Sequence, residues 1–451
     1  MVNSGTTALL TDHYELTMLQ AALRSGAASR HAVFEVFARH LPHGRRYGVV
    51  AGTGRLLDAL ERFRFGPDEL SFLRDNQIVD EATLQYLSSY RFSGNIWGYA
   101  EGDVYFPGSP ILVVEGTFAE SVLLETLLLS VLNHDCAVAS AASRMVTAAG
   151  GPGPDSRPLI EMGSRRTHEM AGVAAARAAY LAGFASTSNL QARLSYGVPS
   201  GGTSAHAFTL VHDSEREAFD AQLTSLGAGT TLLVDTFNVE QAVRAAVEAA
   251  GPSLGAVRID SGDLPALAVS VRALLDSLGA TDTRIILTGD LDEYSISGLA
   301  VAPVDGYGVG TSLVTGSGAP TAALVYKLVA RSDEPVADGD AVDYATLRPV
   351  AKRSVGKPGR GGRKWPVREH SVTGEATTER ILLAPPANLR PTDRVLLQEL
   401  VKDGKIVGRE PLAEARTRHV RALAELPGYA LQLSRGYPAI PTVFGSDVTE
   451  D

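Results

Sequence analysis

Several residues that can hold anions or move protons stand just after short apolar segments of this 451-residue chain. In sequence order they are Arg165, Ser186, Thr187, Ser188, His206, Asp235, Arg258, Asp260, Gly289, Gly308 and Gly310. If the apolar segments are parallel strands of one sheet, their carboxyl ends lie at one edge and these residues converge. The set then offers arginines, carboxylates, a histidine and unobstructed backbone amides, which suits a phosphate-bearing ligand.

Glycine-rich strand ends strengthen the phosphate interpretation. LTGDLDEYS places Gly289 just before an expected helix, and GYGVGTS supplies Gly308 and Gly310 followed by the hydroxyl of Thr311. Glycine lets main-chain N–H groups approach an oxyanion, and a helix N-terminus adds favourable partial charge. Tight turns use the same residues, so each segment alone is weak, but their occurrence at consecutive strand ends favours phosphate binding.

The segment RIDSGD (258–263) is the sharpest local feature. Arg258 and Asp260 are two residues apart and therefore leave an extended strand on one face, with Gly262 turning behind them. The arginine can hold an anion, and the carboxylate can accept ribose hydroxyls or metal-bound water. The same residues also suit a structural ion pair and an N-cap for a helix that begins at Leu264, and both interpretations can hold at once.

His206 lies in the polar, small-residue segment GGTSAHAF, close to Thr203, and not on an apolar helical face. A neutral imidazole can attack a phosphoryl group, and a carboxylate on its other ring nitrogen would fix the tautomer and stabilise the charge formed. Asp235, at the next strand end, is the expected partner. No spacing of histidines and the single cysteine indicates a zinc site.

The elements that must position these residues follow a regular pattern from residue 157 onward, with a strand and an amphipathic helix about every 25 residues. Such units predict parallel strands, in an open doubly wound sheet or a closed barrel. No G-x-G-x-x-G follows the first strand and the glycine-rich ends come last, which favours an irregular TIM-like α/β barrel. The expected strands span 158–163, 183–188, 231–237, 256–262, 284–290 and 304–311, and the clearest helices span 239–250, 264–278 and 291–300.

The whole chain is expected to divide into residues 1–150, 151–350 and 351–451. The first is an N-terminal α+β domain that ends in one long helix over 120–149, before the glycine and proline cluster GGPGPDSRP. The second is the barrel. The third contains a basic run from Lys352 to Arg368, which suits a solvated loop better than a ligand clamp, and a tail that packs back on the N-terminal domain.

Composition narrows the classes of function. Apolar residues make up 45% of the chain and charged residues 20%, as in folded globular proteins, and the formal charge is −10. An extended surface for nucleic acid or anionic membrane is therefore not expected, because it needs clustered Lys and Arg. Cys136 has no possible disulfide partner, the opening segment lacks a signal-peptide pattern and charges interrupt the most apolar stretch (121–142), so a cytoplasmic location is expected.

Taken together and in this order, eight segments closely resemble nicotinate phosphoribosyltransferases. They are TDHYELTM (11–18), EGTFAESVLLETLLLSVLNHD (115–135), EMGSRRTHE (161–169), FASTSN (184–189), GGTSAHAF (201–208), VDTFN (234–238), RIDSGDL (258–264) and GYGVGT (306–311). The resemblance implies a type II phosphoribosyltransferase fold, with an irregular α/β barrel and a smaller domain built from both chain ends. It also implies a homodimer in which Tyr14 and Asp12 enter the partner's site.

The resemblance implies roles for single residues as well. His206 matches the family's phosphorylated histidine, and Asp235 matches the acid that orients it. Arg165 matches an arginine that meets the pyridine ring and its acid group, while Arg258 and Asp260 match residues that grip the phosphoribosyl group. Further substrate contacts are expected from Ser186, Thr187, Ser188 and Thr203, and phosphate contacts from Gly262, Gly289, Gly308, Gly310 and Thr311.

Substrate choice follows from the segment STS. Related nicotinamide enzymes hold the amide with an aspartate near this position, and an aspartate would repel a carboxylate in a partly dry site. Ser186, Thr187 and Ser188 can instead donate hydrogen bonds to a carboxylate, which favours nicotinate over nicotinamide. Met162 stands where the family commonly has an aromatic residue, so stacking on the pyridine ring is expected from Tyr14 or from no residue at all.

The implied reaction joins nicotinate to phosphoribosyl pyrophosphate in NAD salvage, the Preiss–Handler route, with ATP as co-substrate. Mg²⁺ is expected to arrive on the substrate and to meet Asp260, and the enzyme class is that of a ligase. A nicotinamide or quinolinate phosphoribosyltransferase on the same fold is an alternative. A phosphosugar lyase or isomerase barrel is a rival of another class, although no Schiff-base lysine is evident at the strand ends.

Overall fold

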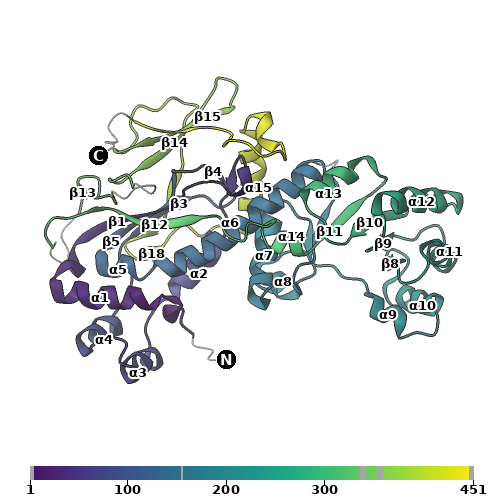
Figure 1. Ribbon diagram of the computed structural model, residues 1–451, viewed down its shortest axis with the longest axis horizontal. Coiled ribbons are helices and arrows are strands. Elements are labelled where there is room, and N and C mark those ends of the chain that lie inside the picture. Colours follow the sequence, from purple (N-terminus) through teal and green to yellow (C-terminus); the bar gives the residue numbers. More distant parts are fainter. Residues whose placement is uncertain (1–4, 154–155, 336–341, 353–358, 446–451) are drawn as a thin grey trace. The chain divides into compact units, whose positions relative to one another are not determined.

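The computed structural model describes residues 5–153, 156–335, 342–352 and 359–445. The chain forms two compact units, unit 1 (Met1–Ala137 and Thr321–Asp451) and unit 2 (Val138–Pro320) (Figure 1). These limits differ from the boundaries expected at 150 and 350. Helix α6 (Glu125–Ala148) runs without a break through the first limit, and β12 (Leu324–Arg331) pairs with β1 (His31–Ala38) of unit 1.

A seven-stranded sheet forms the centre of unit 1, in the order β13-β12-β1-β5-β3-β17-β18. Strands β1 and β5 (Pro110–Thr117) are rich in Val, Ile and Phe, and both are buried along nearly their whole length. The late strand β17 (Leu397–Lys402) pairs antiparallel with β3 (Asn95–Tyr99). The N-terminal and C-terminal parts of the chain thus share one sheet and one hydrophobic core.

The other elements of unit 1 surround this sheet. Its helices are α1 (His13–Ser25), α2 (Thr53–Glu61), α3 (Pro67–Asp75), α4 (Glu81–Ser88), α5 (Phe118–Val122) and α15 (Leu412–Ala424). Strands β13 (Arg348–Pro349) and β18 (Lys405–Ile406) form the two edges of the seven-stranded sheet. The strands outside it are β2 (Gly48–Val49), β4 (Val104–Tyr105), β14 (Trp365–His370), β15 (Ala376–Leu382), β16 (Arg394–Val395) and β19 (Thr442–Phe444). Strands β16, β14, β15 and β19 form a second sheet in that order.

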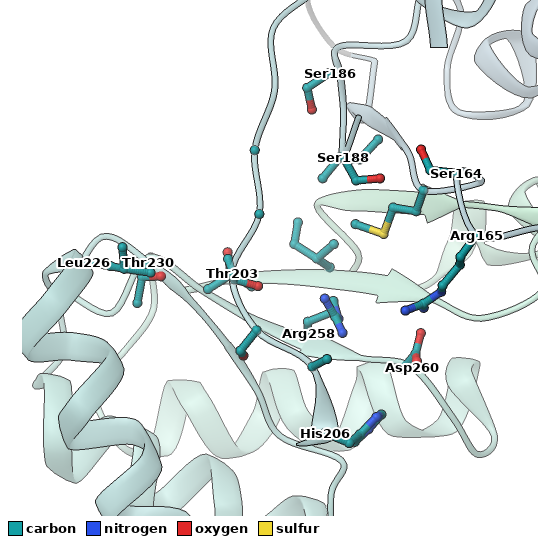
Figure 2. Close-up of a pocket in the computed structure, with 18 of the residues that line it drawn as sticks. Ser164, Arg165, Ser186, Ser188, Thr203, His206, Leu226, Thr230, Arg258 and Asp260 are labelled. Carbon is teal, nitrogen blue, oxygen red and sulfur yellow. The ribbon is translucent and has the colours of Figure 1, made fainter. Parts of the chain in front are cut away.

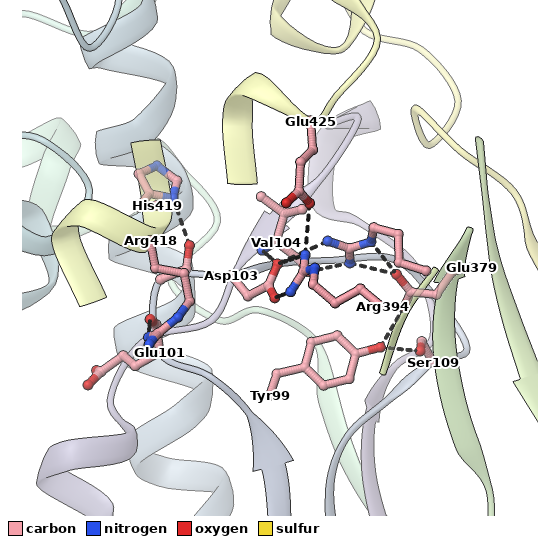
Figure 3. Close-up of polar contacts among 12 residues, drawn as sticks. Tyr99, Glu101, Asp103, Val104, Ser109, Glu379, Arg394, Arg418, His419 and Glu425 are labelled. Carbon is pink, nitrogen blue, oxygen red and sulfur yellow. Dashed lines mark hydrogen bonds and ion pairs between the residues drawn. The ribbon is translucent and has the colours of Figure 1, made fainter. Parts of the chain in front are cut away.

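A buried ionic network fixes the second sheet to the N-terminal part of unit 1 (Figure 3). The guanidinium of Arg368 lies 2.9 Å from Asp103 and 2.7 Å from Glu379, and all three side chains are almost completely buried. Arg394 makes a further ion pair with Asp103 and one of 2.8 Å with Glu425. Although burial opposes ionisation, the two arginines lower the pKa of Asp103 to about 2. Removal of either charge would leave the other buried without compensation.

The structure describes only part of the predicted basic run from Lys352 to Arg368, because residues 353–358 lie outside the described residues. Beyond them, Arg363 pairs with Glu115 at 2.9 Å and Lys364 pairs with Glu35 at 2.9 Å, and all four side chains are buried. This half of the run is therefore neither a solvated loop nor a ligand clamp. Its cations neutralise carboxylates inside the core of unit 1.

The long helix expected over 120–149 is two helices, α5 and α6, which are separated at residues 123–124. Thr117 and Glu120 form a capping box that starts α5. A carboxylate oxygen of Glu15, on α1, accepts hydrogen bonds from the backbone N–H (2.9 Å) and the hydroxyl (2.5 Å) of Thr126. The start of α6 is thus capped by a residue distant in sequence. This explains why the hydrophobic periodicity alone did not predict the break between α5 and α6.

Unit 2 contains a six-stranded parallel sheet in the order β7-β6-β11-β10-β9-β8. The strands are β6 (Leu159–Glu161), β7 (Ser186–Thr187), β8 (Thr231–Leu233), β9 (Ala256–Ile259), β10 (Arg284–Thr288) and β11 (Gly306–Val309), and each falls within an expected strand. Among the described residues, the edge strands β7 and β8 do not pair with each other. The sheet is therefore a half barrel, and the closed TIM-like barrel that the sequence favours is not confirmed.

Helices connect the strands of unit 2, and α10, α11 and α12 pack side by side (Figure 1). They are α7 (Glu169–Leu181), α8 (Leu190–Tyr196), α9 (His206–Leu210), α10 (Glu215–Leu226), α11 (Val239–Ala250), α12 (Leu264–Ser277), α13 (Glu293–Gly298) and α14 (Thr311–Val314). The side chains of Asn238 and Asp263 accept hydrogen bonds from backbone N–H groups in the first turns of α11 and α12, and so cap these two helices. Within the described ranges, no helix is long and apolar enough to cross a membrane.

Candidate active site

A cavity of about 650 Å³ lies in unit 2, along the sheet and at its carboxyl edge (Figure 2). The predicted site residues Arg165, Ser186, Ser188, Thr203, His206, Arg258 and Asp260 line it. The other lining residues are Ile160, Met162, Ser164, Gly201, Gly202, Ser204, Ala205, Leu226, Gly229, Thr230, Thr231 and Ile286. Residues from five strands and from the segment before α9 therefore meet around one space.

His206 and Asp235 form a hydrogen-bonded pair at this cavity. Nε2 of His206 lies 3.0 Å from Oδ1 of Asp235, whose side chain is only 2% exposed. Oδ2 of Asp235 accepts hydrogen bonds from the backbone N–H of Asp260 (2.9 Å) and the hydroxyl of Ser261 (2.7 Å). Although burial opposes ionisation, these contacts and His206 hold the pKa of Asp235 below its ordinary value. An ionised Asp235 can only accept a hydrogen bond, so Nε2 of His206 carries the ring proton and donates it. In a neutral imidazole the free lone pair then lies on Nδ1.

Two arginines make the cavity suitable for an anion. Figure 2 shows the Arg165 side chain directed toward Arg258 and Asp260. The buried Nε of Arg258 has no hydrogen-bond partner among the described residues. Burial lowers the pKa of Arg258 and the charge of Arg165 acts in the same direction, whereas Asp260 and Asp235 oppose the shift. A bound anion would relieve this repulsion and supply the missing acceptor.

The glycines predicted to bind phosphate do not line the cavity. At Gly289, where φ is +109°, a Cβ would lie 2.4 Å from the carbonyl oxygen of Asp260. At Gly308 a Cβ would lie 2.7 Å from the sulfur of Met162. Both glycines thus have a packing reason to be glycine. Gly262, Gly310 and Thr311 also stand outside the lining, and the phosphate role of all five stays a prediction.

The ends of β6 and β7 supply hydroxyl groups. Ser186 and Ser188 line the cavity, whereas Thr187 between them is completely buried and does not. Ser164 also lines the cavity, and its oxygen accepts a hydrogen bond of 2.9 Å from the side-chain amide of Asn189. Three hydroxyls and Arg165 are therefore available to donate hydrogen bonds to a ligand in the cavity.

Comparison with known proteins identifies the family. The family model described as the nicotinate phosphoribosyltransferase (NAPRTase) N-terminal domain matches residues 9–133. Over 450 residues the chain is 58% identical to nicotinate phosphoribosyltransferase pncB1 of Mycobacterium tuberculosis, and the alignment covers 98% of this chain and 96% of that protein. This chain belongs to the nicotinate phosphoribosyltransferase family.

More distant members of the nicotinate phosphoribosyltransferase family agree with this identification. The Bacillus subtilis nicotinate phosphoribosyltransferase is 35% identical over 362 residues, which cover 78% of this chain and 71% of that protein. The crystal structure of human nicotinic acid phosphoribosyltransferase matches with a TM-score of 0.79 at 24% identity, over 97% of this chain and 98% of that one. At that identity the human structure supports the mixed α/β fold alone.

Tyr14, the residue that the nicotinate phosphoribosyltransferase resemblance places in a partner's site, lies on α1 of unit 1 and is 45% exposed. Burial of its hydroxyl and the nearby carboxylates of Glu125 and Glu15 raise the pKa of Tyr14 to about 12. The phenol is thus protonated at neutral pH and can donate a hydrogen bond. Asp12 is the N-cap residue of the same helix.

Sequence reasoning about this nicotinate phosphoribosyltransferase missed several site residues. Ser164 adjoins Arg165 in a recognised segment and could have been included on that ground. Thr230 and Leu226 precede β8 and lie at the end of the cavity away from Arg165, a place that no strand-end pattern indicates. Glu215 has a buried Oε1 without a hydrogen-bond partner in the described part of the chain, and burial and the charge of Asp235 raise its pKa.

Proposed function

We propose that this chain is an ATP-coupled nicotinate phosphoribosyltransferase of NAD salvage. Nicotinate, phosphoribosyl pyrophosphate, ATP and water would give nicotinate mononucleotide, pyrophosphate, ADP and phosphate. Family membership supports this reaction, and the observation that carries it here is the cavity that brings together His206, Arg165, Arg258 and Asp260. One histidine with a carboxylate partner and two arginines are the groups that this chemistry needs.

In the transfer step, the pyridine nitrogen of nicotinate attacks the anomeric carbon, and the bond from that carbon to the pyrophosphate oxygen breaks. The nitrogen becomes a pyridinium, and the bonding electrons leave with pyrophosphate. Arg258 would hold the negative phosphoribosyl group, and Asp260 would accept hydrogen bonds from ribose hydroxyls. We propose that Asp260 would contact the Mg²⁺ carried by phosphoribosyl pyrophosphate, an ion that would supply positive charge to the leaving pyrophosphate.

In the ATP step, Nδ1 of His206 would attack the γ-phosphorus and ADP would leave. Oδ1 of Asp235 accepts a hydrogen bond from Nε2 of His206, with 3.0 Å between the two atoms. The negative charge of Asp235 is therefore placed to stabilise the ring once phosphorylation makes the ring positive. Later hydrolysis of this phosphohistidine releases phosphate and restores the neutral ring. We propose that the cycle favours product formation by changing the affinity of the site for substrate and product.

Nicotinate is the proposed substrate in preference to nicotinamide. Ser164, Ser186, Ser188 and Arg165 present hydrogen-bond donors at the cavity, and Asp260 is the one carboxylate among its lining residues. A negatively charged ring substituent would thus find donors and a cation at the ends of β6 and β7. A neutral amide would gain less from the arginine.

We also propose a homodimer in the cytoplasm, with Tyr14 and Asp12 entering the partner's cavity and the half barrel serving as the irregular barrel of the family. Unit 1 exposes apolar side chains close to Tyr14 in the sequence, and unit 2 exposes others on or beside α8 and α9 and after β8. They are Leu9, Leu10 and Met18 in unit 1 and Leu190, Leu194, Leu210, Val211 and Phe237 in unit 2. Apolar surface of this extent is typical of a contact with another chain.

A subunit-mixing experiment tests the shared site. Tyr14→Ala and His206→Ala should each be inactive in ATP-coupled transfer, but a dissociated and reassociated equal mixture should regain about a quarter of wild-type activity. The reason is that half of the dimers would be mixed, and each mixed dimer holds one site with neither substitution. A mixture that stays inactive, although sedimentation shows mixed dimers, would refute the sharing of residues.

The primary test of function is product formation from radiolabelled nicotinate with phosphoribosyl pyrophosphate, with and without ATP. Nicotinamide and quinolinate serve as competing substrates in the same assay. Nicotinate mononucleotide formed faster with ATP supports the proposal. A preference for nicotinamide or quinolinate would replace nicotinate as the proposed substrate. The absence of product from all three would reject the proposed reaction.

A further inference from the structure

A buried carboxylate lies on the face of the sheet opposite the cavity. Ile160 and Met162 line the cavity, so strand alternation directs Glu161 between them to the other face, where it is completely buried. On the neighbouring strand Thr187 alternates in the same way between two lining serines. Glu161 and Thr187 are direct partners in the pairing of β6 with β7.

These residues belong to a closed ring of hydrogen bonds. Glu161 accepts hydrogen bonds from the backbone N–H of Gly163 and from the hydroxyl of Thr187. The Thr187 oxygen accepts the backbone N–H of Asn189 at 2.9 Å, and the side-chain amide of Asn189 donates to Ser164 at 2.9 Å. Because Ser164 follows Gly163 in the chain, the ring closes on itself. It joins the end of β6 to the end of β7.

The ring requires a carboxylate that only accepts hydrogen bonds. Both partners of Glu161 are donors, and the Thr187 oxygen already accepts the Asn189 N–H, so a protonated Glu161 would leave one hydrogen without an acceptor. Burial raises the pKa of Glu161, and the hydrogen bonds from Thr187 and Gly163 offset this effect only in part, since no cationic group among the described residues acts on it. A buried carboxylate that is held by hydrogen bonds but not by a cation still costs folding free energy, so stability alone does not explain its presence.

We infer that the ring of Glu161, Thr187 and Asn189 positions Ser164, Arg165 and Ser188 for the carboxylate of nicotinate. This inference rests on the proposed function. Ser164 is a member of the ring, Arg165 is the next residue, and the backbone N–H of Ser188 donates to the Glu161 carbonyl at 2.9 Å. A small displacement of either strand end would misalign the donors that recognise the acid group. Glu161 and Thr187 are positioning residues, because neither lines the cavity.

The phosphoribosyl side of the cavity has separate supports. Asp260 accepts a hydrogen bond from Thr288 on β10, and its backbone N–H is held by Asp235. Neither contact involves β6 or β7. Loss of the ring should therefore raise the KM for nicotinate and leave the KM for phosphoribosyl pyrophosphate nearly unchanged.

Thr187→Val tests the inference, with Thr283→Val as the matched control. Both threonines are completely buried in unit 2 and both hydroxyls donate one hydrogen bond, but Thr283 bonds Leu254 at the amino end of β10, away from the cavity lining. We expect Thr187→Val to raise the nicotinate KM by about tenfold or more, with the phosphoribosyl pyrophosphate KM within about twofold of wild type. Thr283→Val should lower the unfolding midpoint without changing either KM.

Two further variants keep the test decisive if Thr187→Val fails to fold. Thr187→Ser retains the hydroxyl and should restore a nearly wild-type nicotinate KM. Asn189→Ser retains a helix N-cap for α8 but removes the amide that reaches Ser164, and it should raise the nicotinate KM without lowering the unfolding midpoint. An unchanged nicotinate KM in Asn189→Ser and in folded Thr187→Val would overturn the inference.

The outcomes separate this inference from the proposed function. A wild-type chain that forms no nicotinate mononucleotide rejects the function itself. An active wild type whose ring variants lose stability alone, as Thr283→Val does, rejects the positioning role and leaves the function standing. A selective rise in the nicotinate KM, reversed in Thr187→Ser, supports both.

Discussion

The substitution Asp235→Asn tests the ATP step most directly, because the structure determines how an amide must fit. The backbone N–H of Asp260 and the hydroxyl of Ser261 both donate to Oδ2 of Asp235. The amide oxygen of the asparagine must take that position, since its NH₂ group there would face donors. The NH₂ group then points at Nε2 of His206, which must accept, and the ring proton moves to Nδ1. Nδ1 is the nitrogen that we propose attacks ATP.

Two losses add up in this variant. The charge-assisted hydrogen bond that stabilises the positive ring contributes about 1.5–3 kcal/mol, and each 1.4 kcal/mol is about tenfold in rate. The wrong tautomer adds to this, and the combined effect on a histidine and carboxylate pair is on the order of 10²- to 10⁴-fold. The cavity wall itself is unchanged, because Asp235 is not among its lining residues.

The assay measures acid-labile phosphate on the protein and ADP release, together with ATP-independent formation of nicotinate mononucleotide. We expect phosphorylation at Nδ1 in the wild type, visible by phosphorus NMR, and its loss in Asp235→Asn. The ATP-independent transfer should persist, and His206→Ala serves as the control without any nucleophile. ATP turnover within about threefold of wild type in Asp235→Asn would refute the assigned tautomer and the role of the pair.

Three other predictions concern different parts of the molecule. Arg258→Ala should raise the KM for phosphoribosyl pyrophosphate by about tenfold or more, because the substrate anion loses the guanidinium that binds it, and steady-state kinetics with an unchanged KM would remove this residue from the site. Ser188→Asp should raise the nicotinate KM by about tenfold through repulsion between carboxylates, and an unchanged value would place acid recognition elsewhere. Arg368→Ala should lower the free energy of unfolding by about 3–5 kcal/mol in denaturant titrations, whereas Arg24→Ala, which removes an exposed ion pair, should have little effect.

The part of the site that faces the cavity was predictable because parallel strands end at one edge of a sheet. Arg165, Arg258 and Asp260 each follow an apolar segment, and the two-residue spacing of the last pair puts both on one face. The pairing of His206 with Asp235 followed from the chemistry of a histidine among small polar residues. For Arg258 and Asp260, position along the strand was enough to determine which way the side chain points.

Features that depend on distant pairing were not predictable in this way. Closure of the barrel depends on whether the edge strands β7 and β8 meet, and neither strand carries a local signal for that contact. The break before α6 depends on Glu15, which lies 111 residues before Thr126. At Gly289 the local pattern indicated phosphate, but the structure adds close approach to the neighbouring strand end as a reason for glycine.

The buried charged groups at and beside the candidate site are compensated differently from those in the core of unit 1. In unit 1 the buried cations Arg363, Lys364 and Arg368 each lie within 3 Å of a buried carboxylate, so attraction offsets part of the cost of desolvation. In unit 2, among the residues that the structure describes, the buried Nε of Arg258 lacks an acceptor, and the buried carboxylate of Glu161 has donors but no cation acting on it. Such groups lower stability in the free protein. A negatively charged substrate would complete the contacts of Arg258, and precise placement of Ser164 and Arg165 would explain Glu161, so the same physical rule marks both as parts of the site.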